Sequence, residues 1–162
     1  MRKQRVRSKN RIPLRGEISL TIRRTDGPTT RLTVRNTITY VGMNALLALF
    51  AQAGITASDY APRKLVPGTN GTPPTPGDIS MGAAVGGPDQ ITLTGPSFSH
   101  NTAARELVIT GTLATTQANG QTLAEVGLVL VNGTLFARQV HPAFLKDGTM
   151  SVTYTWRIST TA

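Results

Sequence analysis

Apolar and polar residues alternate along several short stretches of this chain. The alternation covers residues 17–23, and after an Asp26-Gly27-Pro28 turn it resumes in the same phase over residues 32–40. A period of two is typical of a strand that buries one face, so the two stretches predict a β-hairpin. The polar face of this hairpin would carry three arginines, Arg23, Arg31 and Arg35.

The second half of the chain has the same β pattern. Residues 107–113 and 150–158 alternate, and residues 126–131 are continuously apolar. The Asn132-Gly133 dipeptide lies between two apolar runs, which is a strong signal for a tight hairpin turn. About seven or eight strands are expected in total. The pattern therefore predicts an all-β, mainly antiparallel fold, a β-sandwich, with a small barrel as the alternative.

One segment has a helical period instead. Met43, Leu46, Leu47 and Phe50 recur at positions i, i+3, i+4 and i+7. This spacing predicts one short helix over about 42–53. A helix of about three turns is held mainly by tertiary packing, so this apolar stripe is expected to lie on the sheet.

A long proline- and glycine-rich segment follows the predicted helix. Residues 55–90 contain six prolines, many glycines and few large apolar residues. This composition predicts an irregular loop without regular elements. A loop of this length is unusual in a compact domain, which makes it a second candidate contact region.

The positive charge of the chain is concentrated at its N-terminus. Residues 1–35 hold eleven of the 17 lysines and arginines but only two acidic residues, whereas residues 36–162 are neutral overall. Residues 1–16 have seven basic and no acidic residues, which predicts an N-terminal arm before a single domain over 17–162. The predicted partner-binding residues are Arg2, Lys3, Arg5, Arg7, Lys9, Arg11, Arg15, Arg23, Arg31 and Arg35.

Two kinds of partner fit this charge. Nucleic acid would bind the arm through its phosphates, but no aromatic residue precedes Tyr40, so the arm could not stack on bases and binding would be non-specific. An acidic protein surface fits better because Val6, Ile12, Pro13 and Leu14 are spaced among the charges. No membrane partner is expected, since no apolar run reaches the roughly 20 residues that cross a bilayer.

Few residues could carry catalysis, and none forms a recognised motif. The candidates are His100 with Ser97, Ser99 and Asp89 nearby in sequence, His141, and the carboxylates Glu106 and Glu125. Our interpretation is that the histidines are a loop residue and a strand-end residue, and that the glutamates are strand-edge charges that pair with arginine. The chain has no cysteine, no phosphate-binding loop and no His-Glu-x-x-His sequence. We therefore expect no enzymatic activity, cofactor, metal or small-molecule substrate.

Several segments together resemble small structural proteins of tailed bacteriophages. They are NTITYVGMNALL (36–47), GTPPTPGD (71–78), ANGQTLAEVGL (118–128), LFAR (135–138) and WRI (156–158). The resemblance covers about residues 17–160, and the basic arm departs from it.

This resemblance implies a non-enzymatic virion component made in the bacterial host cytoplasm. Its partners would be other virion proteins, such as major capsid or neck and tail subunits, and copies of itself. A capsid decoration or minor capsid protein, docked through its basic N-terminal arm, is the favoured position, and a neck, tail or baseplate protein is the alternative. A non-specific nucleic-acid-binding module is the rival from another class. Cell-wall degradation is a third interpretation, with no motif behind it.

Overall fold

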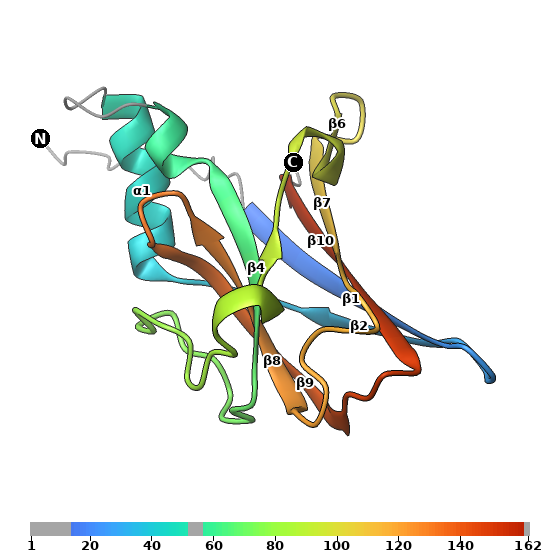
Figure 1. Cartoon of the computed structure of the whole chain (residues 1–162). Coiled ribbons are helices and arrows are strands. Elements are labelled where there is room, and N and C mark those ends of the chain that lie inside the picture. Colours follow the sequence, from blue (N-terminus) through green and yellow to red (C-terminus); the bar gives the residue numbers. More distant parts are fainter. Residues whose placement is uncertain (1–13, 52–56, 161–162) are drawn as a thin grey trace, which may run out of the picture.

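The computed structural model describes residues 14–51 and 57–160, and it has the predicted β-sandwich architecture (Figure 1). The first sheet has the strand order β2-β1-β10-β7-β6 and the second the order β3-β9-β8-β4-β5. All strand pairs are antiparallel. The strands of the first sheet are β1 (Leu14–Arg24), β2 (Thr30–Arg35), β6 (Phe98–Asn101), β7 (Glu106–Leu113) and β10 (Met150–Thr160). Those of the second sheet are β3 (Thr37–Ile38), β4 (Pro62–Gly68), β5 (Ile91–Thr92), β8 (Thr122–Leu130) and β9 (Leu135–Leu145). One α-helix, α1 (Tyr40–Ala51), and three short 3-10 helices, Ala57–Tyr60, Gly87–Asp89 and Gly95–Ser97, complete the described elements.

The hydrophobic core lies between the two sheets. Alternate residues of β10 point into it, and the largest of them, Tyr154 and Trp156, are fully buried. Ile18 and Leu20 of β1 and Leu128 of β8 pack in the same cluster. Burial of one such side chain contributes roughly 1.5–3 kcal/mol, so the strict alternation of β1 and β10 fixes which face of the first sheet turns inward.

The predicted β1–β2 hairpin is confirmed, but its second strand ends earlier than the alternation indicated. β2 stops at Arg35, and the chain then crosses to the second sheet, where β3 pairs with β9. Tyr40 starts α1 and is 67% exposed. The expectation of one continuous strand over 32–40 is therefore wrong: β2 ends at Arg35, and only Thr37–Ile38 beyond it form a strand, in the other sheet. The turn into the helix is fixed by Thr39, whose hydroxyl accepts a hydrogen bond from the Gly42 N–H (3.0 Å). A period of two does not reveal that a strand has changed sheet.

The first strand also begins earlier than the charge pattern predicts. The charge pattern places residues 14–16 in the arm, but they belong to β1 and pair with the end of β10, where Arg15 is opposite Ser159. Residues 1–13 of the predicted arm lie outside the described residues.

Helix α1 is present, and Leu46 of the predicted stripe packs against the core, but the rest of the packing face differs from the prediction. The side chain of Phe50 lies outside the described residues. Gly42 and Ala45 are buried, and Gly42 lies so close to the backbone of Phe136 in β9 that a Cβ atom would overlap it. Met43 and Leu47, expected on the sheet, are 36% and 59% exposed. The helix sequence has no charged residue, so its apolar period says little about its orientation. Because α1 lies so close to β9, only small residues such as Gly42 and Ala45 fit between the helix and the sheet.

The predicted loop over 55–90 contains a core strand, so this prediction is wrong in part. β4 lies between β8 and β5, and its residues Leu65 and Val66 are buried. Pro67 lies beyond the short β5, which pairs only with Lys64 and Leu65. Its carbonyl oxygen accepts the Val85 N–H at 2.8 Å on that side, so the missing N–H of the proline removes only one possible bond at the edge of the sheet. Residues 69–86 do remain irregular apart from a single bridge between Gly68 and Ala84.

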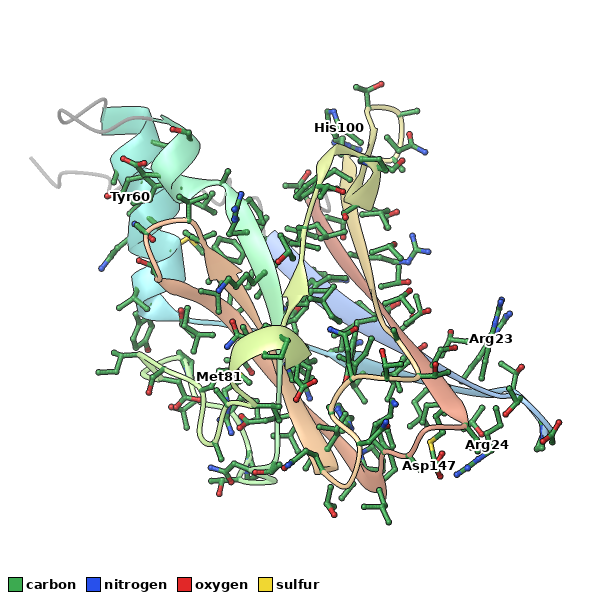
Figure 2. All side chains as sticks on the ribbon, viewed as in Figure 1. Arg23, Arg24, Tyr60, Met81, His100 and Asp147 are labelled. Carbon is green, nitrogen blue, oxygen red and sulfur yellow. The ribbon has the colours of Figure 1, made fainter. Side chains whose placement is uncertain are left out.

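The irregular segment covers the outer face of the second sheet. Met81 lies against Gly127 of β8, at a distance that leaves no room for a side chain there. In Figures 1 and 2, α1 and the segment that contains Met81 lie on the side of β8 and β9 that faces away from β1 and β10. The second sheet is therefore covered on both faces, and the first sheet on one.

Candidate functional site

The uncovered outer face of the first sheet carries exposed arginines on a background of hydroxyl groups. We call it the arginine face. Its charged residues are Arg15, Glu17 and Arg23 of β1, Arg31 and Arg35 of β2, Glu106 of β7 and Arg157 of β10. Five arginines against two glutamates leave this face with a net charge of +3. Of the predicted partner-binding residues, Arg15, Arg23, Arg31 and Arg35 lie here and are exposed. The other six, Arg2, Lys3, Arg5, Arg7, Lys9 and Arg11, lie outside the described residues.

Strand geometry sets the spacing of these charges. Arg31 and Arg35 are four residues apart on β2, which places them about 13 Å from each other. Arg35 is opposite Glu17, and Glu17 is opposite Arg157 on its other side, so the charges form a row of alternating sign across three strands. In Figure 2, Arg23 projects away from the sandwich near the far end of β1.

Threonine and serine fill the positions between the arginines. The hydroxyls of Ser19 and Thr33 are 3.1 Å apart, and those of Thr112 and Thr153 are 2.9 Å apart. Cross-strand hydroxyl pairs of this kind hold neighbouring strands in register. The arginines therefore project from strands whose register these hydroxyl pairs help to hold.

Some arginines near this face already have acidic partners. Arg157 donates to Glu106 at 2.9 Å, and Arg24 donates to Asp147 at 3.3 Å. The pKa of Asp147 is lowered, chiefly by hydrogen bonds from the hydroxyl and amide of Thr149. By contrast, Arg23, Arg31 and Arg35 form no ion pair with any described residue, so their guanidinium groups are available to a partner.

The hydrolytic candidates are not brought together. His100 is exposed on β6, near the tip labelled in Figure 2. The Ser97 hydroxyl accepts a hydrogen bond from the Thr94 N–H at 3.1 Å, and Asp89 accepts one from the Ala118 N–H at 2.7 Å. Among the described residues, no hydrogen bond links His100 to a serine or to Asp89. No cluster of three potential metal ligands occurs in this part of the chain either.

His141 is a core residue. It is 5% exposed, its Nδ1 lies 3.0 Å from the carbonyl oxygen of Pro142, and its ring stacks on Phe144 at a centroid distance of 5.5 Å. Burial lowers the pKa of this imidazole, which favours the neutral form.

The two glutamates lie on different sheets and each pairs with arginine, which confirms the pairing that we expected. Glu106 binds Arg157 on the arginine face. Glu125 is not a strand-edge charge, however: it is fully buried in β8 and binds Nε of Arg138 at 2.5 Å. The described residues do not place the two carboxylates opposite each other across a cleft, as hydrolysis of a glycoside would require.

The pair of Glu125 and Arg138 is the centre of a buried polar cluster that sequence reasoning missed. Arg138 also donates to Asp78 (2.8 Å) and to the carbonyl oxygen of Thr72 (3.0 Å). Glu125 accepts the N–H of Ala83 at 2.7 Å. Burial alone would lower the pKa of Arg138, but its two carboxylate partners raise it instead. The cluster thus fastens the irregular segment 69–86 to the second sheet.

A sequence signal for this cluster exists. Glu125 and Arg138 each interrupt an apolar run, and the Asn132-Gly133 turn lies between them. In the observed register Arg138 is opposite Gly127, so it lies diagonal to Glu125 on the same face. The participation of Asp78 has no comparable signal.

A cleft of about 650 Å³ opens where β1 begins. Its charged lining consists of Arg15, Arg35 and Arg157 with Glu17 and Glu106, so it continues the arginine face. Asn36 also lines it, and the amide oxygen and nitrogen of this side chain have no hydrogen-bond partner among the described residues.

No helix in the described ranges is long and apolar enough to cross a membrane. Comparison of the chain with protein-family models, curated proteins and solved structures finds no match.

Proposed function

We propose that this chain is a non-enzymatic structural subunit of a tailed-phage particle that docks on acidic neighbouring virion proteins through its arginine face. The observation that carries the proposal is the exposure of Arg23, Arg31 and Arg35 on one sheet face, without acidic partners among the described residues. The favoured position is that of a capsid decoration or minor capsid protein. A neck, tail or baseplate position is the alternative.

The chemistry of the face supports docking on a protein. Guanidinium groups bind carboxylates through two parallel hydrogen bonds, and a rigid strand fixes the distance between successive groups. Complementary charge at an interface raises the association rate and selects the partner more than it adds affinity. A face of this kind suits ordered assembly on an acidic shell.

Two features favour a protein partner over nucleic acid. The large aromatic residues of β10, Tyr154 and Trp156, point into the core, so they cannot stack on bases. Glu17 lies between Arg35 and Arg157, where its charge would repel a phosphate backbone but could be accommodated in a mixed protein interface.

The association with a phage particle draws its support from the sequence resemblance, together with the β-sandwich fold. Residues 1–13, which precede β1 in the sequence, add six basic residues and no acidic one to the charge of the chain. The head position is favoured since a small domain with a basic anchor suits reinforcement of a negatively charged shell.

The test compares two double variants that change the net charge equally. Arg31→Gln/Arg35→Gln lowers the net charge of the arginine face from +3 to +1, and Arg63→Gln/Arg105→Gln removes two exposed positive charges elsewhere. Each variant is supplied in trans to phage that lack the gene, and its copies per purified particle are measured by immunoblot. We expect the copy number per particle of the first variant to be at least about tenfold lower than that of wild type, which is the loss expected for one charge-assisted hydrogen bond. The control variant should match wild type. Equal incorporation of both variants would refute docking through this face.

Electron microscopy of intact particles with an antibody against residues 91–162 then locates the protein. Label over the head supports decoration, and label at one vertex or along the tail supports the alternative position. No label on intact or opened particles would overturn the virion proposal. A DNA titration at several salt concentrations tests the rival: if the arginine face binds DNA, the double variant should lower the salt slope by about two.

A further inference from the structure

We propose that the free edge of β2 receives an extended acidic segment of the docking partner, which adds to the first sheet as a sixth strand. The inference rests on the proposed function, because it specifies how an acidic partner would bind the arginine face. Addition of a strand to an exposed sheet edge is a common mode of peptide recognition, in which backbone hydrogen bonds supply affinity and alternate side chains supply specificity.

The hydrogen-bond pattern identifies which backbone groups are free. The Asn36 N–H donates to the carbonyl oxygen of Gly16 at 3.1 Å, so these two opposed residues form a hydrogen-bonded pair. Hydrogen-bonded and non-hydrogen-bonded pairs alternate along an antiparallel ladder. Arg31, Thr33 and Arg35 are therefore in non-hydrogen-bonded pairs with β1, and their backbone N–H and C=O groups point to the open edge.

Two observations agree with this assignment. Side chains of non-hydrogen-bonded pairs are the closer ones, and the hydroxyls of Thr33 and Ser19 are in contact at 3.1 Å. Moreover, β2 ends the strand order of the first sheet, and no other described residue donates to or accepts from the backbone of Arg31, Thr33 or Arg35.

The inner side of β2 is incompletely covered. Leu32 and Val34 pack against the core but are only half-buried, unlike Ile18 and Leu20 of the neighbouring strand. Apolar residues at alternate positions of an added strand would complete this cover. Its other side chains would lie on the arginine face, next to Arg31 and Arg35.

The expected partner segment therefore alternates apolar and polar residues over about six positions, with acidic residues four positions apart. Carboxylates at this spacing match the distance of about 13 Å between Arg31 and Arg35. This pattern defines the chemistry of the partner without requiring a particular protein.

Charge argues against the other occupants. A second copy of β2 would place arginine beside arginine, and like charges across a strand pair are destabilising. Residues 1–13 hold six basic and no acidic residues, so pairing with this segment of a neighbouring copy is disfavoured in the same way. The arginines thus disfavour pairing between the β2 edges of two copies, as charged residues on edge strands commonly do, but they do not disfavour pairing with an acidic strand.

The test uses two substitutions at one position. Thr33→Pro removes the outward N–H and places a ring at the edge, but no hydrogen bond to β1 is lost because the Thr33 N–H does not point to β1. Thr33→Ala is the matched control, since it loses the same hydroxyl contact but keeps the N–H. Both are made in the full chain, and the fluorescence of the single tryptophan, Trp156, monitors folding.

The probe is a fluorescein-labelled peptide of sequence Val-Glu-Val-Thr-Val-Glu-Val, with blocked ends. Its scrambled isomer with adjacent glutamates, and its lysine analogue, are the control peptides. Fluorescence anisotropy should show binding of the probe to wild type and Thr33→Ala, and affinity at least about tenfold weaker for Thr33→Pro, for Arg31→Gln/Arg35→Gln and for both control peptides.

Amide hydrogen exchange by NMR gives a measurement that does not depend on the proline variant. The probe should protect the amides of Arg31, Thr33 and Arg35 and leave those of Leu32 and Val34 unchanged. Uniform protection, or none, would overturn strand addition.

Incorporation into particles separates the inference from the proposed function. If Arg31→Gln/Arg35→Gln lowers incorporation and Thr33→Pro does not, the face docks through side chains alone, and only the strand addition is refuted. If both variants incorporate like wild type, docking through the arginine face is refuted as well. Tenfold loss in both variants, with Thr33→Ala unchanged, supports both.

Discussion

Replacing Glu125 by glutamine removes one charge from the buried cluster and leaves its shape nearly unchanged. The Glu125 side chain is fully buried and that of Arg138 is 4% exposed, so the arginine would keep its charge in a site with little access to water. It would retain Asp78 and the carbonyl oxygen of Thr72 as partners. The substitution therefore tests what the buried carboxylate contributes.

The expected cost follows from burial. Removing one partner of a buried ion pair typically costs 3–5 kcal/mol, and the remaining partners of Arg138 place this case near the lower limit, about 3 kcal/mol. With a urea slope of about 2 kcal/mol per molar, the unfolding midpoint should fall by about 1.5 M. The matched control is Glu106→Gln, which breaks an ion pair of similar length (2.9 Å) on the surface, where the side chain of Arg157 is 42% exposed. Its cost should stay below about 1 kcal/mol.

Equilibrium urea unfolding, followed by the fluorescence of the buried Trp156, measures both variants. The Arg138→Met single variant and the Glu125→Gln/Arg138→Met double variant complete a double-mutant cycle. The coupling energy between the two side chains should exceed about 1 kcal/mol. A Glu125→Gln midpoint within about 0.3 M of the Glu106→Gln value would refute the argument that burial makes this pair important.

Three further predictions concern stability. Burial acts to raise the pKa of Asp78, but its hydrogen bonds outweigh burial and lower the pKa below 3.8. The stability that the ionised Asp78 contributes should be complete above this value and be lost as the pH falls further. In urea unfolding from pH 5 to 2, the Asp78→Asn variant should therefore lose less stability on acidification than wild type. Lys146 is fully buried and donates to three oxygens, so Lys146→Met should cost about 2 kcal/mol and lower the melting temperature by about 4–8 °C in a calorimetric scan. Gly42→Ala should cost about 1–3 kcal/mol by thermal unfolding because its Cβ would overlap the Phe136 backbone, whereas Asn44→Ala, exposed on the same helix, should be neutral or slightly stabilising.

The strands that build the core were the most predictable part of the structure. Alternation located β1 and β10, and the Asn132-Gly133 turn located the β8–β9 hairpin, where Gly133 has a φ of +85°. These features are local, since a period of two and a residue that tolerates positive φ are visible in a few consecutive positions. The arginines of the β1–β2 hairpin were placed on a common polar face for the same reason.

The errors occurred where the outcome depends on distant residues. The prolines of β4 argue against a strand, yet Pro62 is its first residue and Pro67 lies beyond β5, where its carbonyl oxygen still accepts the Val85 N–H from the distant irregular segment. The orientation of α1 depends on the backbone of Phe136, which is far away in sequence. The sequence predicts an arginine partner for Glu125, and Arg138 confirms this. It gives no indication that Asp78, in the irregular segment 69–86, also binds Arg138.

The sequence by itself determined the all-β class, the inward and outward faces of β1, β2 and β10, and the concentration of positive charge before residue 36. Each of these follows from the order of residue types along a short stretch. Only the tertiary structure decided that β2 is an edge strand with its outer backbone groups free, that Arg157 joins the arginine face, and that segment 69–86 is held by a buried ion pair. The physical reason is that the neighbours of a strand, and the burial of a charge, are set by which distant segments pack together, and local periodicity carries no record of that choice.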